Sequence, residues 1–439
     1  MEVPSRPTCL ELFAGCGGLG YGFHKEGFEI VCANELESMI AKTYEANFPE
    51  TTVITGDITD DTIKRRMYEC FDGRECDVII GGPPCVAYSL AGRRNARDPR
   101  GQLYRDYVEI VKTLRPKAFV MENVKGILTI LHDKPELTEE ERGIADAYYA
   151  IEARRQELLE KRKALTLTIT AKKHKQISLE DELKSTLGSE EAEQIQSALV
   201  VINDELKSQT EEFTQVKRDL RTVIAELKAR EGDISRFRMK VTDIIRGDFE
   251  KLGYDVEMKL LNAANYGVPQ RRERVIFIGY RNDLGMKGKI VYPGETHHPD
   301  GADGKLPWVT VRDAIDDLKD LPEDKEGIQQ IYSKHTPAFV EKIAATPVGK
   351  SVNPKYSEAF YRCPPDVPST TVKENHGAVF VHYEKNRVMT PRELARLQSF
   401  PDDFVFKGNK SSMLVQLGNA VPCKLGEAIA GVIKSTLTA

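Results

Sequence analysis

The chain has 439 residues, enough for two or three domains, and 40% of them are hydrophobic and 30% charged. No run approaches the roughly 18 apolar residues that a membrane span needs. The eight cysteines are scattered, so they form neither a disulfide framework nor a Cys/His cluster with zinc-ligand spacing. A net charge of −5 argues against a wholly basic nucleic-acid protein but leaves room for a local basic cleft. We expect a soluble protein of a reducing, cytoplasmic compartment, without a metal site.

The N-terminal segment predicts a strand, a glycine-rich turn and a helix. Residues 8–13 read as the strand, residues 14–20 as the turn and residues 21–26 as the helix. Such a turn lets a cofactor approach the backbone closely, because glycine has no side chain in the way. By itself the turn is weak evidence, and an ordinary connection is the competing interpretation.

Four further strands are predicted at residues 28–33, 52–55, 78–80 and 118–121. Each is followed by a residue that can do chemistry or bind a ligand, namely Glu35, Asp57, Cys85 and Glu122. In a doubly wound sheet the ends of such strands converge on one rim. Glu35 suits a pair of ribose hydroxyls and Asp57 an adenine amine, although either could merely cap a helix. Because all four residues follow predicted strands, a shared functional cleft is favoured over four unrelated helix caps.

The turn after the fourth of these five strands reads Gly81-Gly82-Pro83-Pro84-Cys85. The glycines free the backbone, the prolines stiffen it, and a thiol is presented at the carboxyl edge of the sheet. A thiol in that position is a candidate nucleophile. The competing interpretation is a buried cysteine that acts as a small hydrophobe.

These motifs and three later ones resemble, in order, those of the DNA cytosine-C5 methyltransferases of prokaryotic restriction-modification systems. The resemblance covers about residues 8–130 and 237–435. It rests on the segments 13–18 (FAGCGG), 83–85 (PPC), 122–124 (ENV), 270–274 (QRRER), 390–393 (TPRE) and 418–422 (GNAVP). One departure is Val86, where the family usually has glutamine directly after the nucleophile.

The resemblance implies an α/β fold: a Rossmann-like S-adenosylmethionine-dependent methyltransferase sheet with a small target-recognition domain. It also implies methyl transfer from S-adenosylmethionine, yielding S-adenosylhomocysteine, to C5 of a flipped cytosine in a short double-stranded DNA sequence. Cys85 would form a covalent bond to C6 of that cytosine. Glu122 would hold a proton at N3, while Arg274 and, more weakly, Arg272 would hydrogen-bond the base and position Glu122.

The same resemblance implies two sets of binding residues. The cofactor set comprises Phe13, Ala14, Gly15, Cys16, Gly17, Gly18, Leu19, Glu35, Leu36, Asp57, Ile58, Pro84, Leu103, Asn419 and Ala420. The arginine-rich stretch 89–101 resembles a loop that closes on DNA, with contacts expected from Ser89, Arg93, Arg94, Arg97 and Arg100. A solvated loop is the alternative for that stretch.

Residues 133–235 interrupt the family pattern. Apolar residues recur at heptad spacing through 139–170 and 195–227, which predicts an inserted antiparallel helical coiled-coil hairpin. Arg155 and Arg162 occupy two seam positions, and a separate short helix is predicted at 178–187 before Gly188. The segment holds 23 acidic and 17 basic residues, which disfavours lying along DNA. A protein partner, self-association or a plain spacer arm are the interpretations left open.

The predicted organisation is a catalytic domain in three parts (1–132, 236–285 and 386–439), the hairpin (133–235) and a target-recognition region (286–385). Trp308 opens a structural element at the start of that region. Basic and aromatic residues in it are candidate DNA contacts, namely His335, Lys350, Lys355, Tyr356, Arg362 and Lys373.

Two other functions fit parts of the sequence. An RNA cytosine-5 methyltransferase of the same fold would keep the chemistry and change the substrate. An inactive DNA-binding scaffold would use the coiled coil alone, but intact Cys85, Glu122 and Arg274 argue against it. The leading interpretation remains a DNA methyltransferase associated with the bacterial nucleoid.

Overall fold

A computed structural model describes residues 6–84, 103–185, 190–355, 359–374 and 380–438. The chain forms two compact units, one of residues 1–130 with 240–439 and the other of residues 131–239. The predicted roles of Cys85, Val86, Ser89, Tyr356 and the arginines at 93–100 fall outside the described residues.

The first unit is built on a seven-stranded sheet. Its order is β3-β2-β1-β4-β5-β9-β8, with bounds β1 (Thr8–Leu12), β2 (Glu29–Glu35), β3 (Thr52–Thr55), β4 (Val78–Gly81), β5 (Ala118–Val124), β8 (Tyr254–Asn262) and β9 (Glu273–Arg281). The five N-terminal strands are parallel, and β9 runs antiparallel to both its neighbours. The strand order reverses between β1 and β4, and ligands of open α/β sheets bind at such a switch point. The predicted α/β fold is confirmed.

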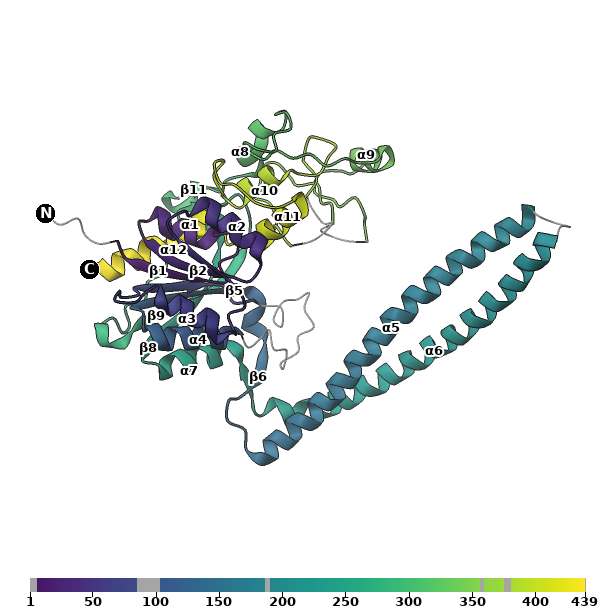
Figure 1. Cartoon of the computed structure of the whole chain (residues 1–439), viewed down its shortest axis with the longest axis horizontal. Coiled ribbons are helices and arrows are strands. Elements are labelled where there is room, and N and C mark those ends of the chain that lie inside the picture. Colours follow the sequence, from purple (N-terminus) through teal and green to yellow (C-terminus); the bar gives the residue numbers. More distant parts are fainter. Residues whose placement is uncertain (1–5, 85–102, 186–189, 356–358, 375–379, 439) are drawn as a thin grey trace. The chain divides into compact units, whose positions relative to one another are not determined.

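Helices cover both faces of this sheet (Figure 1). One face packs against α1 (Gly18–Lys25), α2 (Ser38–Asn47) and α12 (Cys423–Thr438), and the other against α3 (Asp61–Glu69), α4 (Leu103–Leu114) and α7 (Val241–Lys251). Alternation along β1 supplies both cores, because Cys9 faces one layer while Leu10 and Leu12 face the other.

Two strands run further than the sequence predicts. We expected Glu35 and Glu122 to follow their strands, but both lie inside them. The reason is pairing with a neighbour: Glu35 stays in register with Thr55 of β3, and β5 remains paired with β9 as far as Val124. Both carboxylates are therefore held on sheet backbone rather than on loops.

The rest of this unit consists of short elements around long connections. They are η2 (Lys125–Thr129), η3 (Ala263–Tyr266), η4 (Asn282–Leu284), β10 (His297–His298), η5 (Ala302–Gly304), β11 (Leu306–Pro307), α8 (Val311–Ile315), η6 (Asp316–Leu318), α9 (Pro337–Ala344), α10 (Pro391–Leu397) and α11 (Lys410–Asn419). The threonine of the TPRE motif starts α10 with a capping box, in which Thr390 and Glu393 exchange hydrogen bonds. Glu393 is fully buried and is neutralised by a two-pronged ion pair with Arg387.

The second unit is a helical hairpin. Helices α5 (Glu139–Ser185) and α6 (Glu190–Ser235) lie side by side, with β6 (Leu131–Asp133) and β7 (Arg238–Lys240) paired at their base. Leu165, Val216 and Leu220 form a buried cluster between the helices. The predicted hairpin is confirmed, but the separate helix at 178–187 is wrong, because α5 continues unbroken to Ser185. Residues 171–177 contain neither glycine nor proline, so nothing interrupts it.

Both hairpin helices are long but strongly polar. Across the ranges that the structure describes, no helix combines the length and the hydropathy needed to span a bilayer.

Candidate active site

The glycine-rich turn joins β1 to α1 in a strained conformation. Phe13 has a positive φ of 53°, and Gly15 and Gly17 have φ of 56° and 92°. Positive φ is costly for a residue with a side chain and persists where the surroundings enforce it, often at a functional site. A Cβ on Gly15 would meet no described heavy atom within 4 Å, so the turn is open above this residue.

The carboxylate of Glu35 lies against this turn. One oxygen accepts a hydrogen bond from the Gly15 N–H (2.8 Å) and the other from the Glu37 N–H (3.0 Å). Burial is the main cause that raises the pKa of Glu35 above its usual value. At the end of the next strand Asp57 is exposed, and one of its oxygens accepts from the N–H and hydroxyl of Thr59. The strands β2 and β3, which come after the glycine-rich turn in the chain, thus each have, at or just after their last residue, a carboxylate that can accept hydrogen bonds.

The C-terminal motif packs directly on the turn. A Cβ on Gly18 would lie 2.2 Å from the carbonyl oxygen of Val421, so only glycine fits. The Cys16 thiol lies 3.8 Å from the Gln416 carbonyl of α11. The end of α11 therefore brings exposed Asn419 and buried Ala420 to the turn. Of the remaining predicted cofactor residues, Leu36 is exposed after β2 and Ile58 is buried after β3, while Pro84 and Leu103 are half-buried.

Glu122 and Arg274 form the central ion pair of the rim. The Arg274 Nε lies 2.6 Å from Glu122 Oε1, and the two side chains are only 11% and 12% exposed. The register explains the meeting, because Glu122 is paired with Ile276 and Val124 with Arg274, which makes the two charged residues diagonal neighbours on one face. The pair combines charge and hydrogen bonding, which fixes the carboxylate.

The other oxygen of Glu122 faces the turn that leads to residue 85. A Cβ on Gly82 would lie 2.8 Å from Glu122 Oε2, so glycine is needed for this approach. Asn123 donates from its side-chain amide to the Pro83 carbonyl oxygen (3.3 Å). The described part of the turn is therefore fastened to the end of β5, beside the Glu122 carboxylate.

The chain matches the family described as C-5 cytosine-specific DNA methylase over residues 8–142 and 232–435. It belongs to that family. It is 30% identical to the type II methyltransferase M1.HphI of Haemophilus parahaemolyticus, over 97% of this chain and 86% of the relative. It is 28% identical to M.DdeI of Desulfomicrobium norvegicum, over 96% and 87%.

The fold is also that of a solved protein encoded within an Escherichia coli prophage. That structure shares 21% identity and a TM-score of 0.57, and the alignment covers 99% of this chain and all of the other. The protein is thus a DNA (cytosine-5) methyltransferase of the restriction-modification type. Residues 143–231, which form most of the hairpin, lie outside the family match.

Two of the three arginines of the QRRER motif in this methyltransferase, Arg272 and Arg274, have different surroundings. Arg272 is buried, and its guanidinium donates to the carbonyl oxygens of Val372 (2.8 Å) and Gly418 (3.0 Å). The hydrogen bonds therefore direct Arg272 to the recognition region and the C-terminal motif, whereas Arg274 is paired with Glu122. We predicted that both could position Glu122; the structure brings only Arg274 to it, because Arg272 precedes β9 and the strand pairing that aligns Arg274.

One buried carboxylate beneath the turn escaped the sequence analysis. Glu11 of β1 is 1% exposed and accepts hydrogen bonds from the Tyr44 hydroxyl (2.6 Å) and the Gly20 N–H (2.9 Å). Burial raises the pKa of Glu11 to about 7. The available signal was a glutamate within an otherwise apolar strand, which needs a partner when buried. Glu11 fixes the start of α1 and thereby the turn.

The residues of the recognition region that we predicted to contact DNA also differ in their exposure and hydrogen bonding. Lys350 and Lys355 are exposed, as a DNA contact requires. Arg362 is 8% exposed, and its guanidinium donates to the Ile343 carbonyl and the Asn386 side chain. That residue supports the fold of the region, so its prediction as a surface contact is not supported. His335 is half-buried and accepts a hydrogen bond from the Val388 N–H, while Lys373 is exposed.

Proposed function

We propose that this methyltransferase uses S-adenosylmethionine to methylate C5 of a cytosine flipped out of double-stranded DNA, through a transient bond between Cys85 Sγ and C6. The observation that carries the proposal is the placement of Glu122. One of its oxygens is held by Arg274, and the other faces the turn that leads to Cys85. A proton donor and a nucleophile on adjacent strand ends are what addition to an aromatic ring requires.

The described residues fit S-adenosylmethionine. The open space above Gly15 admits a ligand close to the backbone, and Glu35 and Asp57 each offer carboxylate oxygens at the ends of the next two strands. These acceptors suit the ribose hydroxyls and the adenine amine. When bound, S-adenosylmethionine supplies the electrophilic methyl group for C5, and S-adenosylhomocysteine is its product.

Cys85 supplies the nucleophile because C5 of cytosine is too weakly nucleophilic by itself. The Cys85 thiolate forms a bond to C6, and the electron pair of the C5–C6 double bond becomes available at C5. After methylation, a water molecule acts as the base and takes the proton from C5. The electron pair of that C–H bond restores the double bond and expels the Cys85 thiolate, so the nucleophile is regenerated.

Glu122 holds the proton that limits charge on the ring. Addition at C6 places negative charge on the pyrimidine unless N3 takes a proton, and a carboxyl group at N3 donates that proton and later takes it back. Arg274 keeps the carboxyl group in place and is itself directed to the carbonyl oxygen of the base. Arg272 fastens the recognition region behind them, through Val372 and Gly418.

The DNA reaches this rim as a flipped base, since C5 and C6 are shielded within the duplex stack. We expect Ser89, Arg93, Arg94, Arg97 and Arg100 to contact phosphates, and Lys350 and Lys355 to lie near the recognised sequence. A DNA substrate also places the enzyme at the nucleoid. For the hairpin we propose contact with protein rather than DNA, because its residues 133–235 carry 23 acidic and 17 basic side chains.

Bisulfite sequencing of a host that expresses the chain tests the activity. Wild type should protect cytosines from conversion within one short sequence context, and Cys85→Ser should reduce that protection to background. Cys70→Ser is the matched control, because Cys70 caps α3 away from the proposed chemistry, and it should leave the pattern unchanged. Full protection by Cys85→Ser would refute the covalent mechanism, and no protection by wild type would refute the activity.

A mechanism-based trap tests the covalent step itself. A duplex with 5-fluorocytosine at the methylated position cannot lose fluorine as a proton is lost, so the bond to Cys85 should persist. Wild type and Cys70→Ser should migrate as a denaturation-resistant DNA complex, and Cys85→Ser should not. Equal trapping on a single-stranded RNA of the same sequence would contradict a double-stranded DNA substrate.

A further inference from the structure

A basic groove with an apolar floor runs between the two hairpin helices. The groove encloses about 350 Å³ and is lined by Arg155, Leu159 and Arg162 of α5 and by Lys217, Leu220, Arg221 and Ile224 of α6. All of these residues belong to the hairpin unit. Four cations around leucine and isoleucine fit an acidic segment that also carries apolar side chains.

The groove exists because two seam positions of α5 hold arginine instead of an apolar residue. Arg155 and Arg162 are seven residues apart, so both face the seam of the coiled coil. An arginine buries its stem but keeps its charged head in solvent, so it cannot fill the space between helices as leucine does. Ile224, on the opposite wall, is left 52% exposed.

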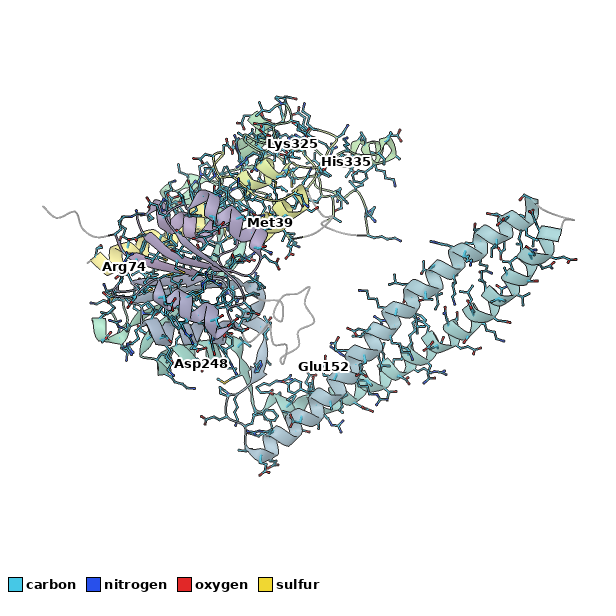
Figure 2. All side chains as sticks on the ribbon, viewed as in Figure 1. Met39, Arg74, Glu152, Asp248, Lys325 and His335 are labelled. Carbon is cyan, nitrogen blue, oxygen red and sulfur yellow. The ribbon has the colours of Figure 1, made fainter. Side chains whose placement is uncertain are left out.

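Most of the positive charge in the groove lacks a carboxylate partner. Arg155 is paired with Glu152 (2.6 Å), which Figure 2 shows on α5 near the base of the hairpin. Among the described residues, none places a carboxylate within ion-pair distance of Arg162, Lys217 or Arg221. Lys217 instead lies over the Phe213 ring at 4.6 Å. Three cations are therefore available to an incoming anion.

The hairpin itself carries a matching acidic segment at its other end. We define the acidic end as residues 176–185 of α5 and 191–196 of α6, which hold five acidic residues (Glu180, Asp181, Glu182, Glu191 and Glu193) and one lysine. Apolar residues Leu179, Leu183 and Ile195 are interspersed among them. We propose that a second copy of this chain occupies the groove, with the acidic end of each hairpin placed in the basic groove of the other.

The dimensions suit this pairing. From Leu159 to Glu180 is 21 residues of continuous helix, or roughly 32 Å. Two hairpins side by side and antiparallel would overlap over that length and about 20 Å of width, or roughly 640 Å², somewhat less than the roughly 800 Å² per partner of a standard interface. Leu167, Val200 and Val201 lie between the groove and the acidic end, Ile177 lies at its edge, and these side chains are 55–64% exposed. A two-fold arrangement makes both contacts identical, as closed dimers require.

Charge reversal with sedimentation velocity tests the pairing on the full chain. Wild type should dimerise in the micromolar range, and more weakly as salt rises. A groove variant (Arg162→Glu with Arg221→Glu) and an end variant (Glu180→Lys with Glu191→Lys) should each dimerise at least about tenfold more weakly. Mixing the two should restore a heterodimer, because each groove then meets an end of opposite sign. A chain with all four changes should pair with itself.

The matched control reverses two neighbouring cations that do not line the groove. Lys163→Glu with Arg218→Glu makes the same change in net charge, and it should leave dimerisation within about twofold of wild type. Far-ultraviolet circular dichroism must show unchanged helix content for every variant. A monomeric wild type, or equal loss in the control, would overturn the proposal.

A photo-crosslink identifies the occupant in the cell. With p-benzoylphenylalanine in place of Ile224, we expect a product of twice the chain mass, joined to the acidic end. A link to another protein or to nucleic acid would overturn the assignment to a second copy. The inference rests on the proposed protein-contacting role of the hairpin, and methylation is measured in parallel. Loss of dimerisation with methylation intact separates its outcome from that of the proposed reaction.

Discussion

The sheet unit and the hairpin place their distinctive side chains in opposite kinds of surroundings. On the sheet, functional residues lie where the backbone is closest: Gly18 against the Val421 carbonyl and Gly82 against the Glu122 carboxylate. On the hairpin, they line an open groove of about 350 Å³ around Arg155 and Arg162. Chemistry needs groups fixed to a fraction of an ångström, whereas recognition of a partner needs an unfilled surface.

The largest expected effect separates the two units by activity. Glu122→Gln keeps the shape of the side chain but cannot exchange the proton at N3, so methyl transfer should fall about 10²–10⁴-fold. Replacing residues 134–233 with a short linker should instead leave methylation of naked DNA within a few-fold of wild type. Both are measured as initial rates of tritiated methyl incorporation into a duplex that contains the recognised sequence.

Two checks keep this contrast interpretable. Glu109→Gln is a control for a carboxylate-to-amide change in the same unit. It should leave methylation near the wild-type rate, because the Glu109 side chain is 52% exposed and the buried Lys64 keeps Asp106 as an ion-pair partner. If removal of the hairpin abolishes methylation while Trp308 fluorescence shows a folded sheet unit, the hairpin contributes to DNA binding. The division of labour between the units would then be wrong.

The second contrast compares two glycine-to-alanine changes. In Gly18→Ala the new Cβ would lie 2.2 Å from a backbone carbonyl oxygen, so the turn or the C-terminal motif must shift, at about 3 kcal/mol of unfolding free energy. In Gly143→Ala of α5 the Cβ meets nothing within 4 Å, and alanine should stabilise the helix by about 0.5–1 kcal/mol. Urea unfolding reports both, with Trp308 fluorescence for the sheet unit and circular dichroism for the helices.

The critical result is that the two substitutions change the unfolding free energy in opposite directions. Trp308 is the only tryptophan and is hydrogen-bonded to Asn265 within the sheet unit, so its signal isolates that unit. A neutral Gly18→Ala would show that the turn and the C-terminal motif are not rigidly joined.

Local pattern was enough to predict most of the sheet and the hairpin. Buried strands of the N-terminal half are short apolar runs, and the coiled coil repeats over more than four heptads, so both signals are contained in the sequence near each element. The ends of β2 and β5 were missed because they are set by pairing with Thr55 and with β9, which are distant in sequence. The break assumed near residue 178 failed for the opposite reason, since local composition favoured a continuous helix.

The site was predictable in its residue types but not in its partners. A motif names Arg272 and Arg274 equally, and only the register between β5 and β9 assigns Glu122 to Arg274. Arg362 is a charged residue in a region predicted to consist of loops, so we expected it at the surface. It is instead buried and hydrogen-bonded to Ile343 and Asn386. Such outcomes depend on contacts between segments about 20 to 150 residues apart, which periodicity does not encode.

The third contrast concerns Glu11. Its charge is costly because the side chain is buried, whereas the exposed carboxylates of the hairpin are solvated. Burial raises its pKa to about 7 in the folded chain, from 4.5 for a free side chain. The folded state therefore binds its proton more tightly, so the stabilisation is complete below about pH 4.5 and is lost as pH rises through about 7. Wild type should lose about 3 kcal/mol of unfolding free energy across this window relative to Glu11→Gln, which stays neutral.

Urea titrations at pH 5.0, 6.0, 7.0 and 8.0, followed by Trp308 fluorescence, measure this slope directly. Glu211→Gln is the matched control, because Glu211 is exposed on the hairpin and should leave the fluorescence-detected slope unchanged. Glu35 is raised by burial as well, but it is present in all three chains, so the difference between wild type and Glu11→Gln isolates Glu11. Parallel curves for those two chains would mean that Glu11 is already ionised at pH 5 in the fold. The Tyr44 hydroxyl and the Gly20 N–H would then be sufficient to stabilise its charge beneath the glycine-rich turn.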